Sequence, residues 1–212
     1  MSMVSVSAAT IEASHGDVFN LGKELLGNTL HIGDKNFAYW QYLDLGTGVS
    51  ADEVYIQALQ GQSIGIAIIG SWQAGDGDDV DAQIWFRVTH DQELATIIGS
   101  SLAIGGSAGD DGLVTVHEDQ CAGGLLFACN PGHDTNLFVS DPGSSFDSVS
   151  YDKAYAFVDV FKDIGINGPG AISRIEQYFI QEGDVPEVPE PTTMLLFSTA
   201  LLGLGFMRRK KS

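Results

Sequence analysis

The strongest constraint on the fold of this chain is a repeated alternation of apolar and polar residues. In the segment AQIWFRVT the apolar side chains fall at every second position, at Ile84, Phe86 and Val88. Successive side chains of a β-strand point to opposite faces, so this period of two predicts a strand with one buried face. The segments EVYIQAL and LVTVHE alternate in the same way. On the opposite face of the first strand we expect Gln83, Trp85 and Arg87.

Further strands are predicted by longer segments. IGIAIIGSW and YAFVDVF are apolar at more consecutive positions, which is typical of central strands. AISRIEQYFI alternates again, which places Gln177 and Phe179 on one face and Ile172 on the other. Only VFNLGKELLGN has helical spacing, and Gly22 interrupts it.

Turn-forming residues separate these segments. IGDKN, GTGVS, QAGDGDDVD, GGSAGDDG, NPGHD, SDPGSS and INGPG combine Gly, Pro, Asn and Asp, which are the residues that tight turns favour. Short strands joined by such turns predict an all-β fold. We expect a two-sheet antiparallel β-sandwich over residues 17–182.

The charge of the chain limits its partners. It has 28 Asp and Glu residues against 10 Lys and Arg, which gives a net charge of −18. A body of this charge repels nucleic acids and anionic membrane surfaces, so we expect no nucleic-acid partner. The acidic residues would attract divalent cations, or they would serve only to keep the surface soluble, and the composition leaves both roles open.

The only two cysteines lie close together, in the segment QCAGGLLFACN. An isolated close pair predicts a local disulfide between Cys121 and Cys129, and therefore an oxidising compartment. Closing so short a loop would contribute roughly 2–3 kcal/mol to stability. Two buried free thiols are the alternative, whereas a zinc site would need further ligands nearby.

An apolar stretch without any charged residue covers residues 192–207. As a helix it would be about 24 Å long, which is short of the ~30 Å hydrocarbon core but within reach of it. A helix that packs against a protein core is the alternative. Such a helix needs a polar face toward the solvent, and this stretch has none. We therefore expect a short transmembrane helix.

Two flanking segments support this prediction. Residues 183–191 are rich in proline, so they form an extended spacer after the sandwich. Residues 208–212 hold a basic cluster that would stay at the cytoplasmic face and leave the preceding body outside the cytoplasm. The cations of this cluster are Arg208, Arg209, Lys210 and Lys211.

The end of the chain resembles the PEP-CTERM protein-sorting signal. Pro189, Glu190 and Pro191 carry the resemblance, together with the apolar stretch and the terminal basic cluster that follow. The resemblance implies that an exosortase, a membrane-embedded enzyme, recognises this tripeptide and processes the tail. The helix would then hold the precursor in the inner membrane only temporarily, as the tail of a GPI signal does. The mature protein would be exported to the cell surface or the extracellular space.

The body is similar to a recurrent group of small secreted PEP-CTERM proteins. LHIGDKNFAYWQY, IGIAIIGSW, CAGGLLFACN and VFKDIGINGPGAISRIEQYFIQ carry this likeness. The group has no assigned catalytic activity, so the resemblance implies an architecture and a destination but no chemistry.

The N-terminal residues 1–16 include VSVSAAT, which resembles the small-residue end of a signal peptide. They lack the basic start and the full apolar core of a complete signal. We expect them to be the remnant of a signal region, cut short at its start, or a disordered segment.

No catalytic motif is present in the sequence. It has no G-x-S-x-G, no H-E-x-x-H and no Gly-rich phosphate loop after a strand. HEDQC gathers polar residues, but on an alternating strand His117 and Asp119 share one face while Glu118 lies on the other. A structural role across the strands is the simpler interpretation.

The candidate metal ligands lie in the segment GDGDDVD. Asp76, Asp78 and Asp81 supply oxygen atoms on a glycine-flanked loop, which suits calcium. The spacing departs from the EF-hand loop, and a solvated turn is the alternative. We expect no other cofactor. Asp110 and Asp111 form a weaker second candidate.

Several aromatic residues could line a carbohydrate-binding surface, because sugar rings stack on aromatic rings. In β-sandwiches such residues more often belong to the core. The residues concerned are Tyr39, Trp40, Tyr42, Trp72 and Trp85.

Two functions are consistent with these observations. The first is a non-enzymatic exported protein of the cell surface or extracellular matrix, with a structural or adhesive role on exopolysaccharide. The second is a secreted hydrolase acting on matrix polysaccharide. A cleft that holds two carboxylates at a catalytic separation would favour the hydrolase.

Overall fold

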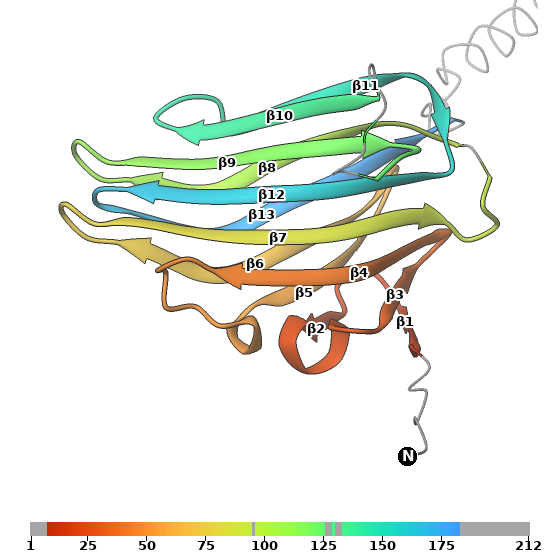
Figure 1. Ribbon diagram of the computed structural model, residues 1–212, viewed down its shortest axis with the longest axis horizontal. Helices are drawn as coiled ribbons and strands as arrows, with labels where there is room; N and C mark the ends of the chain where they lie inside the picture. The colour runs from red at the N-terminus through yellow and green to blue at the C-terminus, as the bar shows by residue number, and fades with distance from the viewer. Residues whose placement is uncertain (1–7, 95, 126–128, 130–132, 183–212) are drawn as a thin grey trace, which may run out of the picture. The chain divides into compact units, whose positions relative to one another are not determined.

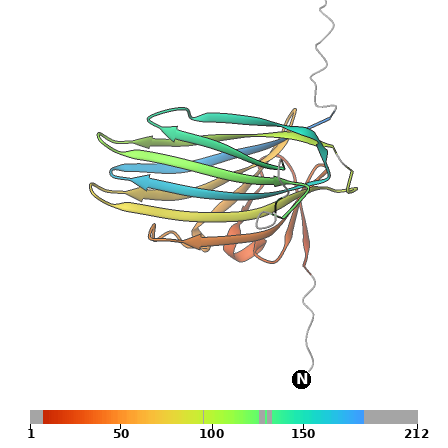
Figure 2. The same ribbon diagram turned by 45° about the horizontal axis from the view of Figure 1, so that its top comes forward.

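Two β-sheets packed face to face form the body of the protein (Figures 1 and 2). The computed structural model describes residues 8–94, 96–125, 129 and 133–182. The predicted all-β sandwich is confirmed. The spacer, the apolar stretch and the basic cluster predicted for residues 183–212 lie outside the described residues.

One sheet has seven strands, which lie in front in Figure 1. Its strands are antiparallel except for the parallel pair β1–β3 at one edge. In spatial order they are β1 (Thr10–Ala13), β3 (Thr29–Ile32), β4 (Lys35–Asp44), β7 (Asp79–His90), β12 (Phe157–Asn167), β9 (Leu113–Ala122) and β10 (Asp134–Asp141).

The second sheet has six strands, and all of its pairs are antiparallel. Two single-turn helices, Leu21–Leu25 and Ala51–Glu53, lie beside its short β2. The strands are, in spatial order, β11 (Phe146–Tyr155), β8 (Ile97–Ala108), β13 (Gly170–Gln181), β6 (Ile64–Ala74), β5 (Tyr55–Gln60) and β2 (Val18–Asn20).

The predicted start of the sandwich at residue 17 is too late. Thr10–Ala13 forms β1 and pairs with β3, so the described part of the first 16 residues already belongs to the fold. Backbone pairing at the edge holds this segment, and its alternate side chains Ile11 and Ala13 pack against the core. Among the described residues, no helix has the length and the apolar character that crossing a bilayer requires.

The core lies between the two sheets and is built by the alternation seen in the sequence. Ile84, Phe86 and Val88 all point inward from β7. The ring of Phe86 contacts those of Phe37 and Phe179, with centroids 6.3 and 6.4 Å apart. Large aromatic rings packed this closely supply much of the apolar burial that stabilises a sandwich.

A β-bulge gives Ile172 the opposite orientation to the one predicted from the sequence. The register of β13 shifts between Ile172 and Arg174 against both of its neighbours. The shift changes the phase of the alternation, so Ile172 and Ile175 both lie in the core, although the simple alternation placed them on opposite faces.

The predicted disulfide is present. Cys121 and Cys129 are bonded, with their Cα atoms 5.7 Å apart. Cys121 lies at the end of β9 on the outer face of the seven-stranded sheet, where Gly124 lies beside its Sγ. The disulfide therefore ties Cys129 to the end of β9.

Candidate functional site

An aromatic pair lies on the outer face of the seven-stranded sheet. Trp85 of β7 and Phe161 of β12 are directly opposite each other in the ladder. Their ring centroids are 4.8 Å apart with a tilt of 33°. Both side chains point outward because their neighbours in sequence fill the core, and both are only half-buried. The sheet therefore presents two partly exposed aromatic rings on its outer face.

Polar side chains continue the row on both sides of this pair. Gln41 of β4 lies opposite Trp85, and Asp119 of β9 lies opposite Phe161. Asp119 in turn faces Asn136 of β10, whose Nδ2 donates a hydrogen bond of 2.5 Å to its Oδ1. Two rings are thus flanked by amide and carboxylate groups.

The next row of the sheet repeats this combination. Gln83 donates a hydrogen bond of 3.1 Å to Asp163 Oδ1 across β7 and β12. His117 lies beside Phe138, whose side chain is 50% exposed, with ring centroids 6.4 Å apart. The sequence prediction that His117 and Asp119 share a face is confirmed. We call the following set the aromatic face: Gln41, Gln83, Trp85, His117, Asp119, Asn136, Phe138, Phe161 and Asp163.

A depression lies next to the aromatic face, around Arg87. The guanidinium forms two hydrogen bonds with Asp159, of 2.5 and 3.0 Å, which raise the pKa of Arg87. It also lies 5.2 Å from the ring centre of Tyr39 and 4.7 Å from that of Phe157. The depression has a volume of about 630 Å³. Its lining consists of Thr10, Thr29, Asn36, Ala38, Tyr39, Arg87, Thr89, Glu93, Ala156 and Phe157.

Tyr39 is held in an unusual position at the rim of this depression. Its φ of +59° lies in the left-handed region, and its side chain is 70% exposed. It falls in the bulge where the register of β4 shifts between Ala38 and Gln41. Strained positions of this kind are often found at functional sites because the surrounding structure must hold them.

The three residues predicted to bind calcium do not come together. Asp81 lies within β7, and its carboxyl group interacts with that of Asp163. Burial, together with the charge of Asp163, raises the pKa of Asp81 to about 6. Asp76 and Asp78 lie instead in the turn before β7. The spacing in the sequence places all three close together, but the strand separates them.

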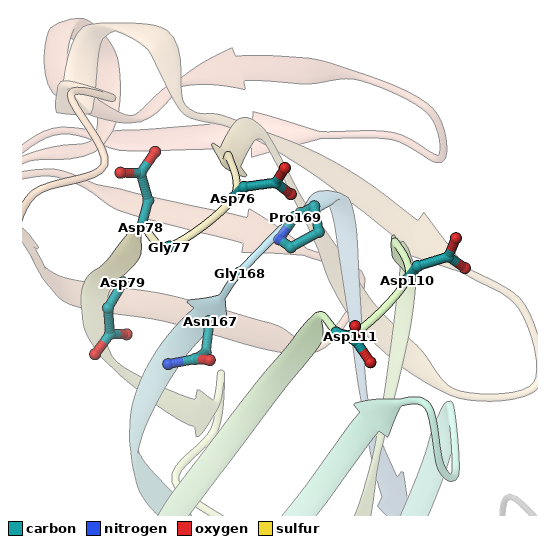
Figure 3. A pocket seen from close by; sticks show the side chains of 9 residues that line it. All are labelled: Asp76, Gly77, Asp78, Asp79, Asp110, Asp111, Asn167, Gly168 and Pro169. Atoms are coloured by element: carbon teal, nitrogen blue, oxygen red, sulfur yellow. The ribbon is translucent and has the colours of Figure 1, made fainter.

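Asp76 and Asp78 form part of an acidic cluster at one end of the sandwich. The β6–β7, β8–β9 and β12–β13 turns meet there, at the left in Figures 1 and 2. They line an open depression of about 790 Å³, shown in Figure 3, around which the carboxylates point in different directions. Within the described ranges, no group of three or more His, Cys, Asp or Glu side chains is arranged to hold a metal ion. Calcium binding therefore stays a prediction. The lining residues are Asp76, Gly77, Asp78, Asp79, Asp110, Asp111, Asn167, Gly168 and Pro169.

The aromatic residues singled out in the sequence divide between the core and the outer face. Trp40 and Trp72 are buried, and the hydroxyl of Tyr42 donates to the Val49 carbonyl at 2.7 Å. Trp85 and Tyr39 are the two that reach the outer face.

Phe161 and Phe138 were missed by sequence reasoning. In YAFVDVF both faces carry apolar side chains, so the outward position of Phe161 could not be distinguished from a central strand buried on both sides. Phe138 lies between Leu137 and Val139, so the apolar residues are consecutive there and the sequence does not show which of them points outward.

The comparisons with known proteins concern the tail and the fold separately. Residues 187–211 match the PEP-CTERM protein-sorting motif. No curated protein sequence matches the chain.

Three solved structures share distant likeness with the sandwich. The Glycosylation Associate Protein (Gap123) complex from Streptococcus agalactiae matches at 9% identity and a TM-score of 0.31, over 66% of this chain and 26% of that chain. The enzymatically active domain of tailspike protein 4 of bacteriophage CBA120 matches at 12% identity and a TM-score of 0.30, over 66% of this chain and 19% of that chain. The mannan-recognising carbohydrate-binding module TmCBM27 matches at 9% identity and a TM-score of 0.25, over 70% of this chain and 99% of that chain.

These likenesses are too distant to bear on function, and the chain spans only 26% and 19% of the first two structures. The sorting motif is the specific finding. The tripeptide Pro189, Glu190 and Pro191 and the basic residues Arg208 to Lys211 fall within the matched range, outside the described residues. The chain therefore carries, at residues 187–211, the PEP-CTERM protein-sorting motif, which implies an exported protein that an exosortase sorts.

Proposed function

We propose that this protein is a non-enzymatic component of the cell surface or extracellular matrix that binds exopolysaccharide through the aromatic face. The observation that carries the proposal is the outward position of Trp85 and Phe161. Both rings are only partly buried, so each leaves some apolar surface open to the solvent. A ligand that covers them would gain a fraction of the roughly 1.5–3 kcal/mol that complete burial of such a side chain provides.

The chemistry of the aromatic face suits a sugar chain. The C–H face of a pyranose ring packs on an aromatic ring, and its hydroxyl groups both donate and accept hydrogen bonds. Gln83 and Asn136 can donate to those hydroxyls, while Asp119 and Asp163 can accept from them. Aromatic stacking surrounded by a few polar groups is the usual composition of a small-molecule site.

The charge of the site favours a neutral polymer. The aromatic face includes Asp119 and Asp163, and the chain as a whole has a net charge of −18. An anionic polysaccharide would be repelled unless divalent cations bridged the two. We therefore infer that the bound segments consist of neutral hexoses.

A hydrolase acting on matrix polysaccharide is the second candidate, and one observation favours it. Asp81 has a raised pKa of about 6 and lies on the same outer face of β7 as Trp85, which would suit a general acid. Against this, Asp81 and Asp163 interact directly, whereas glycosidase carboxylates lie roughly 5–9.5 Å apart to admit the substrate. Binding without cleavage is the better supported function.

The test compares binding with cleavage. The purified protein is titrated into the producing cell's own exopolysaccharide and into neutral glucan and mannan, while the release of reducing ends is followed in parallel. Trp85→Ala and Phe161→Ala are each expected to weaken binding at least ~10-fold, which corresponds to about 1.4 kcal/mol.

The matched control is Phe146→Ala, which removes an exposed aromatic ring, 57% accessible, from β11 of the other sheet. It should bind as the unsubstituted protein does. Equal binding by all variants would refute the aromatic face as the site. Release of reducing ends that is lost in Asp81→Asn would support the hydrolase instead.

A further inference from the structure

The core of the sandwich contains a lysine. Lys162 points inward from β12, between Val160 and Ile164, and its side chain has no exposed surface. Removing an ammonium group from water is costly, and this burial lowers the pKa of Lys162 well below its ordinary value. The neutral amine, which burial favours, is a nucleophile.

Two side chains from different strands meet this amine. Glu118 of β9 lies directly opposite Lys162 in the ladder, and its Oε2 accepts a hydrogen bond from the Lys162 Nζ. Gln177 of β13 reaches across from the other sheet, and its Oε1 accepts from the same nitrogen at 2.5 Å. All three side chains are fully buried. An amine, a carboxyl group and a carboxamide therefore lie together in a site closed to bulk solvent.

Further hydrogen bonds fix the carboxyl group of Glu118. Gln120 donates from Nε2 to Glu118 Oε1, and it also donates to the hydroxyl of Ser100 at 2.7 Å. Tyr151 donates its hydroxyl to Gln120 Oε1 at 2.6 Å. Orienting partners of this kind are what an acid–base group in a reactive site needs.

The amide nitrogen of Gln177 is left without a partner. Its Nε2 is buried and has no hydrogen bond, although a buried donor of this kind is costly to leave unsatisfied. This Nε2 is the nitrogen that would leave as ammonia if Lys162 attacked the side-chain amide of Gln177.

From this arrangement we propose that Lys162 and Gln177 form an intramolecular isopeptide bond, with Glu118 transferring the proton. The Lys162 Nζ attacks the Cδ of Gln177, and Glu118 accepts the proton that the nitrogen gives up. Glu118 then returns the proton to Nε2, which leaves as ammonia when the C–N bond breaks. The carbonyl oxygen stays in the new amide, so the reaction needs neither an oxidant nor a cofactor.

The fold supplies what drives the reaction. Holding the groups in contact replaces a bimolecular encounter by a unimolecular step, and their complete burial shields the product from bulk water. The product would join β12 of one sheet to β13 of the other by a covalent bond. This inference does not depend on which polymer the aromatic face binds.

The test is peptide mass spectrometry on the full 212-residue chain, purified after folding and then denatured, reduced and digested with trypsin. Acylated Lys162 resists trypsin, so peptide 154–174 should be found linked to the peptide that begins at Ile175. The linked mass should be about 17 Da below the sum of the two peptides, because ammonia has left. A free peptide 154–162 in stoichiometric yield would overturn the proposal. Linkage to Glu118 with loss of water, about 18 Da, would overturn the assignment of Gln177.

Three variants test the roles of the groups. Gln177→Glu should form the same link but release water, and Gln177→Met should form none. Glu118→Gln should remain unlinked while circular dichroism shows a folded sandwich; a link in this variant would refute the role of Glu118. Ser100→Ala is the matched control, since it alters the same network without touching Lys162, and it should retain the link.

Discussion

Lys162 and Glu118 face each other directly across the β12–β9 ladder, and neither side chain has any exposed surface. The amine of Lys162 and the carboxyl group of Glu118 are hydrogen-bonded to each other in a core that is otherwise mainly apolar. Removal of one partner therefore has a different consequence from removal of both, and this difference can be measured.

The single substitution Lys162→Met should destabilise the fold strongly. It leaves Glu118 buried without its partner, which typically costs about 3–5 kcal/mol. The double variant Lys162→Met with Glu118→Leu should be more stable than the single one, because two apolar side chains of similar volume replace the pair and neither variant can form the link to Gln177. Urea unfolding followed by tryptophan fluorescence measures both. A double variant no more stable than the single one would show that the pair does not act as a unit.

Asp81→Asn should stabilise the protein at neutral pH. The pKa of Asp81 is raised from 3.8 to about 6 in the fold, so the folded state binds a proton more readily than the unfolded state. Stability is therefore lost as the pH rises through 6, and it is regained towards pH 4. The substitution should add about 1 kcal/mol at pH 7, after allowance for solvent screening, and almost nothing at pH 4.

Melting temperatures across this pH range measure the effect. Asp76→Asn removes the same charge from the exposed turn and serves as the control. If both substitutions stabilised equally, the gain would come from the net charge of the chain and not from the contact with Asp163.

Reduction of the disulfide should lower stability without abolishing the fold. Cys121 and Cys129 close a loop with a sequence separation of 8, so the chain-entropy contribution is roughly 2–3 kcal/mol. Dithiothreitol should lower the melting temperature of the native chain but not that of the double variant Cys121→Ser and Cys129→Ser. An unchanged melting temperature in the native chain would argue against a stabilising role.

The sorting motif makes a prediction about the mature protein. If an exosortase recognises Pro189 to Pro191, protein recovered outside the cell should lack the residues that follow, and Glu190→Ala should accumulate unprocessed in the inner membrane. The measurement is the C-terminal peptide of the exported protein. Recovery of a peptide that still ends in RRKKS would contradict processing, and deletion of residues 208–211 is expected to alter sorting without changing the thermal transition of the body.

The strands and their buried faces could be predicted because a strand records its own orientation in a local period of two. Trp85 was expected on the face opposite to Ile84 and Phe86, and it lies there. At Ile172 the local period predicts the wrong face, because a bulge inserts an extra residue and reverses the phase of the alternation.

The composition of the site could not be predicted because it depends on which strands are neighbours. Trp85 meets Phe161 only since β7 pairs with β12, although these residues are far apart in the chain. For the same reason Lys162, Glu118 and Gln177 gave no signal: they lie on three different strands, each beside other polar residues, and only the packing of the two sheets brings them together. Long-range pairing is set by the packing of the whole sandwich and not by any one segment.

The acidic cluster concentrates negative charge at one end of the sandwich. Five aspartates, from two turns and the first position of β7, gather there, while the aromatic face lies along the outer side of the seven-stranded sheet. At physiological ionic strength such charges repel over about 8 Å. Copies aligned on one polymer would therefore resist meeting through these ends, and this repulsion would set a minimum spacing between them. A higher concentration of divalent cations would screen this repulsion and shorten the minimum spacing. The same molecules would then be packed more densely in the matrix at high divalent-cation concentration than at low concentration.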